Sequence, residues 1–326
     1  MSKEETNELF KDLIGQNIAI SLLSAILKYK KFAPAYLFAG PDGVGRSIAA
    51  RRFLEGMITD GVAFMRERKR IEKLNHPDIL WIEPSYMHQG KLIPQSITKE
   101  ASINKKSPPL IRLEQIRDIK KFLSKQPIEA KLHMVVIEEA ERMNEAAANA
   151  LLKTLEEPQN GVLILICQRP ENLLSTIRSR CQIIPFTKLH SNDLEKIYSK
   201  IQINEEIEFS VIVNNQELFN LANGSPGALI DNINTWNELP QELLSRLKVL
   251  PRKPIDALSL ARDLIETLDI EQQLWLINWL QQYIWNKHRD GTAIKILESL
   301  RRQLVSFVQP RLAWEVALLK LSEVKD

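Results

Sequence analysis

Eight consecutive residues, Gly40–Ser47 (GPDGVGRS), have the spacing of a phosphate-binding loop, GxxxxG followed by a basic residue and Ser or Thr. The glycines of such a loop let backbone N–H groups close around phosphate oxygens, and a following helix adds a favourable dipole. Here they are Gly40, Gly43 and Gly45. Arg46 stands where lysine normally contacts the β- and γ-phosphates, and its larger planar fork does not replace lysine cleanly. Three alternatives stay open: nucleotide binding without efficient hydrolysis, a relic loop that binds nothing, and a glycine-rich turn that has no ligand.

Two acidic residues, Glu138 and Glu139, directly follow the apolar run Val135–Ile137. In phosphate-loop ATPases the first acid at such a strand end holds Mg²⁺, and the second orients the attacking water. Glu138 is one methylene longer than the usual aspartate, which shifts a bound metal, whereas Glu139 is correctly placed as a base. We therefore expect Mg²⁺ to be held through Ser47 and Glu138 only if nucleotide binds. The structural alternative is that both carboxylates cap a strand and face solvent.

Two further positions lack groups that phosphate-loop ATPases usually carry. Cys167-Gln168 stands at a strand end where a Thr, Ser or Asn commonly senses the γ-phosphate. Ala228, in the segment GSPGA, stands where a lid segment often carries arginine. Together with Arg46 and Glu138, these departures argue against robust ATP turnover.

Apolar runs and helical periods alternate along the first half of the chain and predict the elements that hold these residues. Strands are expected in Ala35–Ala39, His76–Pro84, His133–Glu139 and Val162–Cys167, and helices in Gly15–Tyr29, Ile48–Met57, Ile111–Leu123 and Asn144–Glu157. This alternation is typical of an α/β fold with a parallel sheet covered by helices on both faces. Tyr86–Pro109 has mixed polar composition with three prolines and is expected to be a surface insertion or loop.

From Leu189 onward the strand patterns stop, and the remaining patterns are helical. The last part contains apolar, Trp-rich stretches such as LWLINWLQQYIW and LAWEVALLKL. We expect domain boundaries near Phe186 and Trp236, which divide the chain into 1–187, 188–237 and 238–326.

The bulk composition is that of an ordinary globular protein: 326 residues, 44% hydrophobic, 26% charged, with a formal net charge of +3. This charge is too small to define a nucleic-acid-binding protein. The longest apolar runs are too short to span a bilayer, and MSKEETNELF lacks the apolar stretch of a secretory signal. We therefore expect a cytoplasmic protein without membrane contact. Two separated cysteines, Cys167 and Cys181, and five scattered histidines predict neither a disulfide framework nor a metal site.

Seven blocks that run in order along nearly the whole chain resemble the clamp-loader branch of the AAA+ ATPases. They are GQNIAISLL, PAYLFAGPDGVGRS, NHPDILWIEP, EEAERMNEAAANALLKTLEEP, RPENLLSTIRSRC, NGSPG and QPRLAWEVALLKL. The combination of AERMNEAAANALLKTLEEP with SRC is highly specific. The resemblance implies a RecA-like α/β phosphate-loop domain over 1–187, a small helical lid over 188–237, and an all-α collar domain over 238–326 that packs with its counterparts in a pentameric ring.

Within that branch, the resemblance extends to two bacterial subunit types of DNA polymerase III. The motor type, gamma or tau, is expected to keep lysine in the loop, Asp-Glu at the strand end, and usually a four-cysteine zinc module. Gly61–His76 contains no cysteine, so no zinc is expected, although this does not separate the two types. Arg46, Glu138 and the short C-terminus favour the delta-prime type, with a weak or absent ATPase of its own. The alternatives are an ATP-hydrolysing motor subunit that uses Arg46, Ser47 and Glu139, and, more distantly, a branch-migration motor.

The SRC block implies a role for Arg180. In clamp loaders this arginine crosses the subunit interface and stabilises γ-phosphate charge on a neighbour's ATP, as an arginine finger supplied in trans. The resemblance thus implies an organising subunit that contacts gamma/tau and delta, supplies Arg180, and helps to open the sliding clamp on primed template DNA. The sequence contains no polymerase or nuclease constellation, so DNA synthesis would belong to other chains.

A basic stretch offers a second nucleic-acid interpretation. Thr98–Lys131 contains nine Lys/Arg and four Asp/Glu, a surplus of five positive charges (9 − 4). Such a stretch could meet phosphates of the primed template in a salt-sensitive contact that ignores sequence. A solvated helix face at Arg112–Lys125 explains the same charges equally well.

Overall fold

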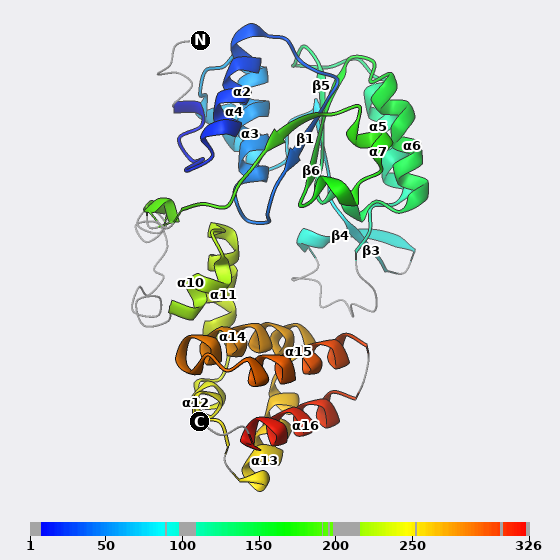
Figure 1. The fold of residues 1–326 in the computed structure, drawn as a ribbon. Helices are drawn as coiled ribbons and strands as arrows, with labels where there is room; N and C mark the ends of the chain where they lie inside the picture. The colour runs from blue at the N-terminus through cyan, green and yellow to red at the C-terminus, as the bar shows by residue number, and fades with distance from the viewer. Residues whose placement is uncertain are drawn as a thin grey trace. The chain divides into compact units, whose positions relative to one another are not determined.

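The computed structural model describes residues 8–88, 90–97, 109–190, 192–194, 196–197, 216–251, 253–306 and 309–323. The chain divides into two compact units, Met1–Leu194 and Glu195–Asp326. The first unit is α/β and the second is helical in its described residues (Figure 1).

The first unit is built on a five-stranded sheet whose strands pair in parallel (Figure 1). The strand order is β2 (Ile79–Ile82), β5 (His133–Ile137), β6 (Gly161–Cys167), β1 (Ala35–Ala39) and β7 (Gln182–Pro185). Every residue of β1, β5 and β6 is buried, because helices cover both faces of the sheet centre. The predicted parallel α/β sheet is confirmed.

Alternate residues of the central strands enter two separate cores. On one face, Tyr36 and Phe38 pack with residues of α2 (Asn17–Tyr29), α3 (Arg46–Ile58) and α4 (Met65–Glu72). On the other, Leu37 packs with residues of α5 (Leu113–Leu123), α6 (Glu145–Glu156) and α7 (Ser175–Arg178). Figure 1 shows the two helix groups on opposite sides of the sheet. Continuous apolar strands are therefore required, since both directions of each strand are buried.

The stretch Tyr86–Pro109, expected to be a surface insertion or loop, contains regular structure in its first part. β3 (Ser85–His88) and β4 (Lys91–Pro94) form an antiparallel hairpin, followed by a short 3-10 turn at Gln95–Ile97. The turn uses Gly90, whose φ of 77° suits glycine. Four-residue strands give too short an alternation to stand out from a polar loop. The remainder of the stretch, 98–108, lies outside the described residues.

A buried carboxylate, Asp78, organises the turn before β5. It accepts backbone N–H bonds from Ile128, Glu129 and Ala130, each 2.7 Å long, and is fully buried. Burial raises the pKa of Asp78, but the bonds from Ala130, Ile128 and Glu129 together outweigh it, so that the pKa lies below its usual 3.8. The folded state therefore prefers the charged carboxylate.

We expect Asp78→Asn to lower the free energy of unfolding of the first unit by about 1–3 kcal/mol at neutral pH, because the amide cannot accept all three bonds. A depressed folded-state pKa stabilises the protein above the unfolded-state value and ceases to do so as the pH falls through the folded one. The difference between wild type and variant should hold from pH 8 to 5 and shrink below about pH 4. Urea unfolding at several pH values measures it; a difference that does not change down to pH 2 would contradict the assignment.

The second unit contains seven helices among its described residues. They are α10 (Gln216–Ala222), α11 (Pro226–Glu238), α12 (Gln241–Val249), α13 (Pro254–Thr267), α14 (Ile270–His288), α15 (Gly291–Val305) and α16 (Pro310–Glu323). They share one core, in which Trp236 of α11 lies against Trp279 of α14 with ring centroids 5.2 Å apart. The end of strand patterns after Leu189 is confirmed for the part of this unit that the structure describes, whereas the division at 237/238 stays a prediction.

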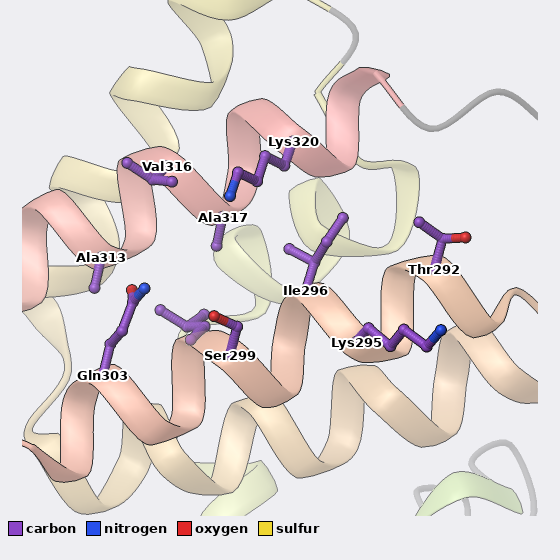
Figure 2. Close-up of a pocket in the computed structure, with 10 residues that line it drawn as sticks. Thr292, Lys295, Ile296, Ser299, Gln303, Ala313, Val316, Ala317 and Lys320 are labelled. Carbon is purple, nitrogen blue, oxygen red and sulfur yellow. The ribbon is translucent and has the colours of Figure 1, made fainter.

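A shallow groove of about 230 Å³ lies between α15 and α16 (Figure 2). Its floor carries small and apolar side chains such as Ala313, Ala317 and Ile296, and Lys295 and Lys320 lie at its rim. In the ranges that the structure describes, no helix combines the length and apolarity needed to cross a membrane.

Candidate functional site

The candidate phosphate loop connects β1 to α3, as its spacing predicts. Gly40, Gly43 and Gly45 all have positive φ, at 156°, 69° and 98°, and Gly45 caps the amino end of α3. A Cβ at Gly40 would lie 2.3 Å from the carbonyl oxygen of Phe186, so only glycine lets the loop pass this closely. The loop backbone therefore has a conformation that needs its glycines and ends at a helix N-terminus.

Arg46 turns out to be held within the loop. Its side chain is 8% exposed and forms an ion pair with Asp42, four residues earlier. The other terminal nitrogen, Nη1, is buried without a hydrogen-bond acceptor among the described residues. A buried guanidinium nitrogen without an acceptor is costly, and a phosphate oxygen at the loop would supply one. The site thus fits an anion, although Asp42 already balances part of the charge.

Ser47 and Glu138 are brought together, and the structure pairs them with each other. The Ser47 side chain hydrogen-bonds the Glu138 carboxyl group, which is half-buried. Burial raises the pKa of Glu138, although this bond and the positive charge of Arg51 oppose the shift. Hydroxyl and carboxylate oxygens are ligands that Mg²⁺ prefers. These two residues would hold the ion beside a bound nucleotide, at the cost of their mutual hydrogen bond.

Glu139, the candidate base, follows β5 with a left-handed backbone, φ 44° and ψ 51°. Its carboxylate forms an ion pair with Arg142 in the following 3-10 turn. The guanidinium occupies carboxylate lone pairs that would otherwise accept from an attacking water. Glu139 therefore lies at the predicted strand end in a paired state.

The other two positions that differ from the usual ATPase residues, Cys167-Gln168 and Ala228, also lie beside hydrogen-bonding partners in their own chain. β6 ends at Cys167, and the backbone N–H of Gln168 donates to Glu141 Oε1 at 2.8 Å. Burial raises the pKa of Cys167 to about 12, so this thiol stays neutral at physiological pH. In the second unit, Ser225 caps α11 and accepts from the backbone N–H of Ala228 at 3.1 Å. Neither Cys167 nor Ala228 supplies a charge.

Arg180 lies at the amino edge of the parallel sheet, whereas the loop follows the carboxyl end of β1. It precedes β7, in which Gln182 pairs in register with Tyr36, four residues before Gly40. Four strand residues span about 13 Å, and Arg180 lies further still from the carboxyl edge. Its side chain is 37% exposed and reaches Glu156 at 2.6 Å.

Sequence patterns did not identify two of the residues that complete this arrangement. The buried side chain of Gln16 donates to the carbonyls of Val44 in the loop (3.3 Å) and Thr187 after β7 (2.7 Å), and accepts from Thr187 N at 3.1 Å. The second residue that sequence patterns did not identify is Glu156, the ion-pair partner of Arg180. Both contacts join segments at least 24 positions apart in sequence, so no local period signals them, whereas the Asp42–Arg46 pair has the i, i+4 spacing that could have been noticed.

The basic stretch Thr98–Lys131 is only partly visible, because 98–108 lies outside the described residues. In its described part, Lys121 pairs with Asp118 and Lys131 with Asp60, as a solvated face would. Within the described ranges, no group of three His, Cys, Asp or Glu side chains is placed to hold a metal ion.

The parallel sheet carries a glycine loop after its second-from-edge strand and acids at the end of β5, and a helical unit follows it in the sequence. These features define an α/β phosphate-loop protein of the AAA+ class. The family model described as "DNA polymerase III, delta subunit" matches residues 15–190, just over half of the chain, and the chain belongs to this family. A second model, "Cyanobacterial DNA polymerase III delta prime, C-terminal domain", matches residues 198–321. The resemblance to the delta-prime type is confirmed.

Curated relatives agree with this assignment. The DNA polymerase III subunit delta' of Bacillus subtilis is 30% identical over 201 residues, which are 60% of this chain and 53% of that protein. The subunit delta' of Pseudomonas aeruginosa is 34% identical over 46% of this chain and 42% of its own length. The tau subunit of B. subtilis is 29% identical over 61% of this chain and 32% of its length. The chain thus spans about half the length of the delta' relatives it matches.

Among solved structures, a DNA polymerase III gamma subunit-related protein from Thermotoga maritima has a TM-score of 0.53. The two are 20% identical, and the match covers 94% of this chain and 99% of the other. At this identity the likeness concerns the fold.

Proposed function

We propose that this chain is a delta-prime-like subunit of a DNA polymerase III clamp loader, and that it assists ATP-dependent loading of a sliding clamp by supplying Arg180 to a neighbour's ATP site. One observation carries the proposal: an exposed arginine in the family's SRC block lies at the sheet edge opposite its own phosphate loop. From there it can act on a phosphate only if another chain presents it.

The state of the chain's own loop supports an organising role. Arg46 is paired with Asp42, Ser47 with Glu138, and Glu139 with Arg142. Each of these side chains already has a partner within the chain, so binding of a nucleotide or its metal must replace at least part of those contacts. The glycine backbone and the free Nη1 of Arg46 still fit a phosphate, and Ser47 with Glu138 would hold Mg²⁺ there. When bound, Mg·ATP would supply phosphoryl-transfer chemistry; these residues would orient it poorly.

The partners in this proposal are the loader subunits gamma/tau and delta in a pentameric ring, the sliding clamp, and primed template DNA. The second unit would serve as lid and collar, and the exposed Leu312 and Val316 of α16 give it apolar surface beyond its core. The setting would be cytoplasmic. The competing proposal, an ATP-hydrolysing motor subunit, has one favourable observation, the glycine loop itself.

The experiment that tests the proposal is DNA-stimulated ATP hydrolysis by the assembled loader with Arg180→Ala in this chain. A fall in turnover while the complex still assembles supports the function. Unchanged turnover removes it.

A separate prediction concerns the chain's own site. We expect the isolated chain with Arg46→Lys and Glu138→Asp to bind Mg·ATP at least about tenfold more tightly than the wild type. Lysine places a compact charge on the phosphates, and the shorter acid leaves Ser47 free for the ion. Titration calorimetry measures both affinities. Equal affinities would contradict this explanation, and wild-type turnover that falls on Glu139→Gln would favour the motor subunit instead.

A further inference from the structure

The side chain of Arg180 is held in a defined orientation by two contacts within its own chain. Nη2 forms the ion pair with Glu156, the last residue of α6, and Nη1 donates to the backbone carbonyl of Thr176 at 3.0 Å. The backbone is held as well: the N–H of Arg180 donates to Ile177, which is fully buried, and β7 begins two residues later. Two of the five N–H donors of the guanidinium are used, so three remain for a ligand.

A contribution to folding stability does not explain why a glutamate stands at position 156. It is 52% exposed at the carboxyl end of a helix, where the helix dipole disfavours a negative charge. Exposed ion pairs contribute little to folding because water and salt screen them. A residue that breaks a local rule without stabilising the fold is typical of a functional position.

Holding the guanidinium in place has a clear benefit for a group that acts across an interface. A free arginine side chain samples many rotamers, and ordering it when a partner binds costs free energy. The planar guanidinium must also meet phosphate oxygens in a fixed geometry. Because its contact with Glu156 is exposed and weak, a more highly charged phosphate can share or replace it without a large penalty.

We infer that Glu156 is the positioning residue of Arg180: it fixes the guanidinium in the orientation in which it meets a triphosphate on a neighbouring subunit. This inference rests on the proposed function, since it assigns a residue to the same site. Glu156 touches no reacting atom and acts through Arg180 alone.

The test uses the complete loader assembled with this chain as wild type, Glu156→Gln, Arg180→Ala, the double variant, and Glu157→Gln. Glu157 is the matched control, because it is an exposed glutamate at the same helix end and makes no ion pair among the residues the structure describes. We expect Glu156→Gln to lower kcat for DNA-stimulated ATP hydrolysis by about 2- to 10-fold, the effect of leaving one side chain unordered, with KM for ATP unchanged. Glu157→Gln should behave as wild type, and the double variant should match Arg180→Ala.

A second measurement needs no ATP. In the isolated full chain, ¹⁵N relaxation of the arginine Nε–H groups should show greater mobility at Arg180 in Glu156→Gln than in wild type or Glu157→Gln. The Arg180→Ala spectrum identifies the signal. Equal mobility in all three chains overturns the inference.

The kinetic outcomes separate the two claims. If Arg180→Ala lowers turnover but Glu156→Gln leaves it unchanged or raises it, the positioning role is wrong and the proposed function stands. If Glu156→Gln lowers turnover further in the Arg180→Ala background, Glu156 acts through something else and the inference fails. If Arg180→Ala has no effect, the proposed function fails and the inference falls with it.

Discussion

A loader assembled with Arg180→Ala in this chain is expected to hydrolyse ATP at the neighbouring site at least about 100-fold more slowly, with its subunit composition unchanged. An arginine finger supplied in trans contributes about 10³–10⁵ in rate in other phosphoryl-transfer proteins, because it meets charge that develops only in the transition state. The side chain is exposed and outside both cores of its unit, so its removal should not disturb folding. Single-turnover hydrolysis by the complex, combined with size-exclusion chromatography, measures rate and assembly together.

Two further variants give this experiment its specificity. Arg178→Ala removes a neighbouring arginine from the end of α7 and should leave turnover at the wild-type level. Arg180→Lys keeps the charge but loses the planar fork, so it should recover only part of the rate. Equal losses in Arg178→Ala and Arg180→Ala would indicate a general disturbance of α7, which would contradict a role specific to Arg180.

The sequence was informative where function depends on a local pattern. The loop glycines are visible in the sequence because the loop needs positive φ at all three, and because Gly40 also passes close to Phe186. The central strands could be predicted from the sequence because helices cover both faces of the sheet, and strands buried in this way are continuous apolar runs. These two signals were enough to predict that Ser47 follows the loop at the start of a helix and that Glu138 follows the end of β5.

The pairing of those side chains could not be predicted in the same way. Whether Ser47 is free or bonded to Glu138 depends on how α3 packs against the ends of β1 and β5. The contact of Glu156 with Arg180 depends on α6 returning to the amino edge of the sheet. A motif gives the residue types at a site, whereas tertiary packing decides which of them are already satisfied. A loop can therefore resemble an ATP site in its sequence although its side chains are already bonded to one another.

A buried ionic network joins α3 to α4, and no sequence pattern indicated it. Glu55 of α3 is fully buried; its Oε1 accepts from the backbone N–H of Phe64 and its Oε2 from Arg68 Nε, both at 2.9 Å. Arg68 is 6% exposed and also donates to the carbonyl of Leu9. Arg52, 7% exposed, lies 3.7 Å from the same carboxylate and pairs more closely with other acids. Glu55 is therefore the acceptor on which the placement of α4 depends.

We expect Glu55→Ala to destabilise the first unit by about 3–5 kcal/mol, because it removes the closest partner of the buried Arg68 and leaves only the more distant, partly exposed carboxylate of Asp12 at 3.6 Å. Hydrogen exchange followed by mass spectrometry measures this in α3 and α4 peptides separately from the second unit. Glu72→Gln is the matched control: its carboxylate is 41% exposed and Arg52 keeps Asp12, so the loss should stay below about 1 kcal/mol. Replacing both Glu55 and Arg68 by methionine should recover much of the stability, since no unpaired charge is left. A double variant as unstable as Glu55→Ala would show that packing, rather than the ion pair, holds α4 in place.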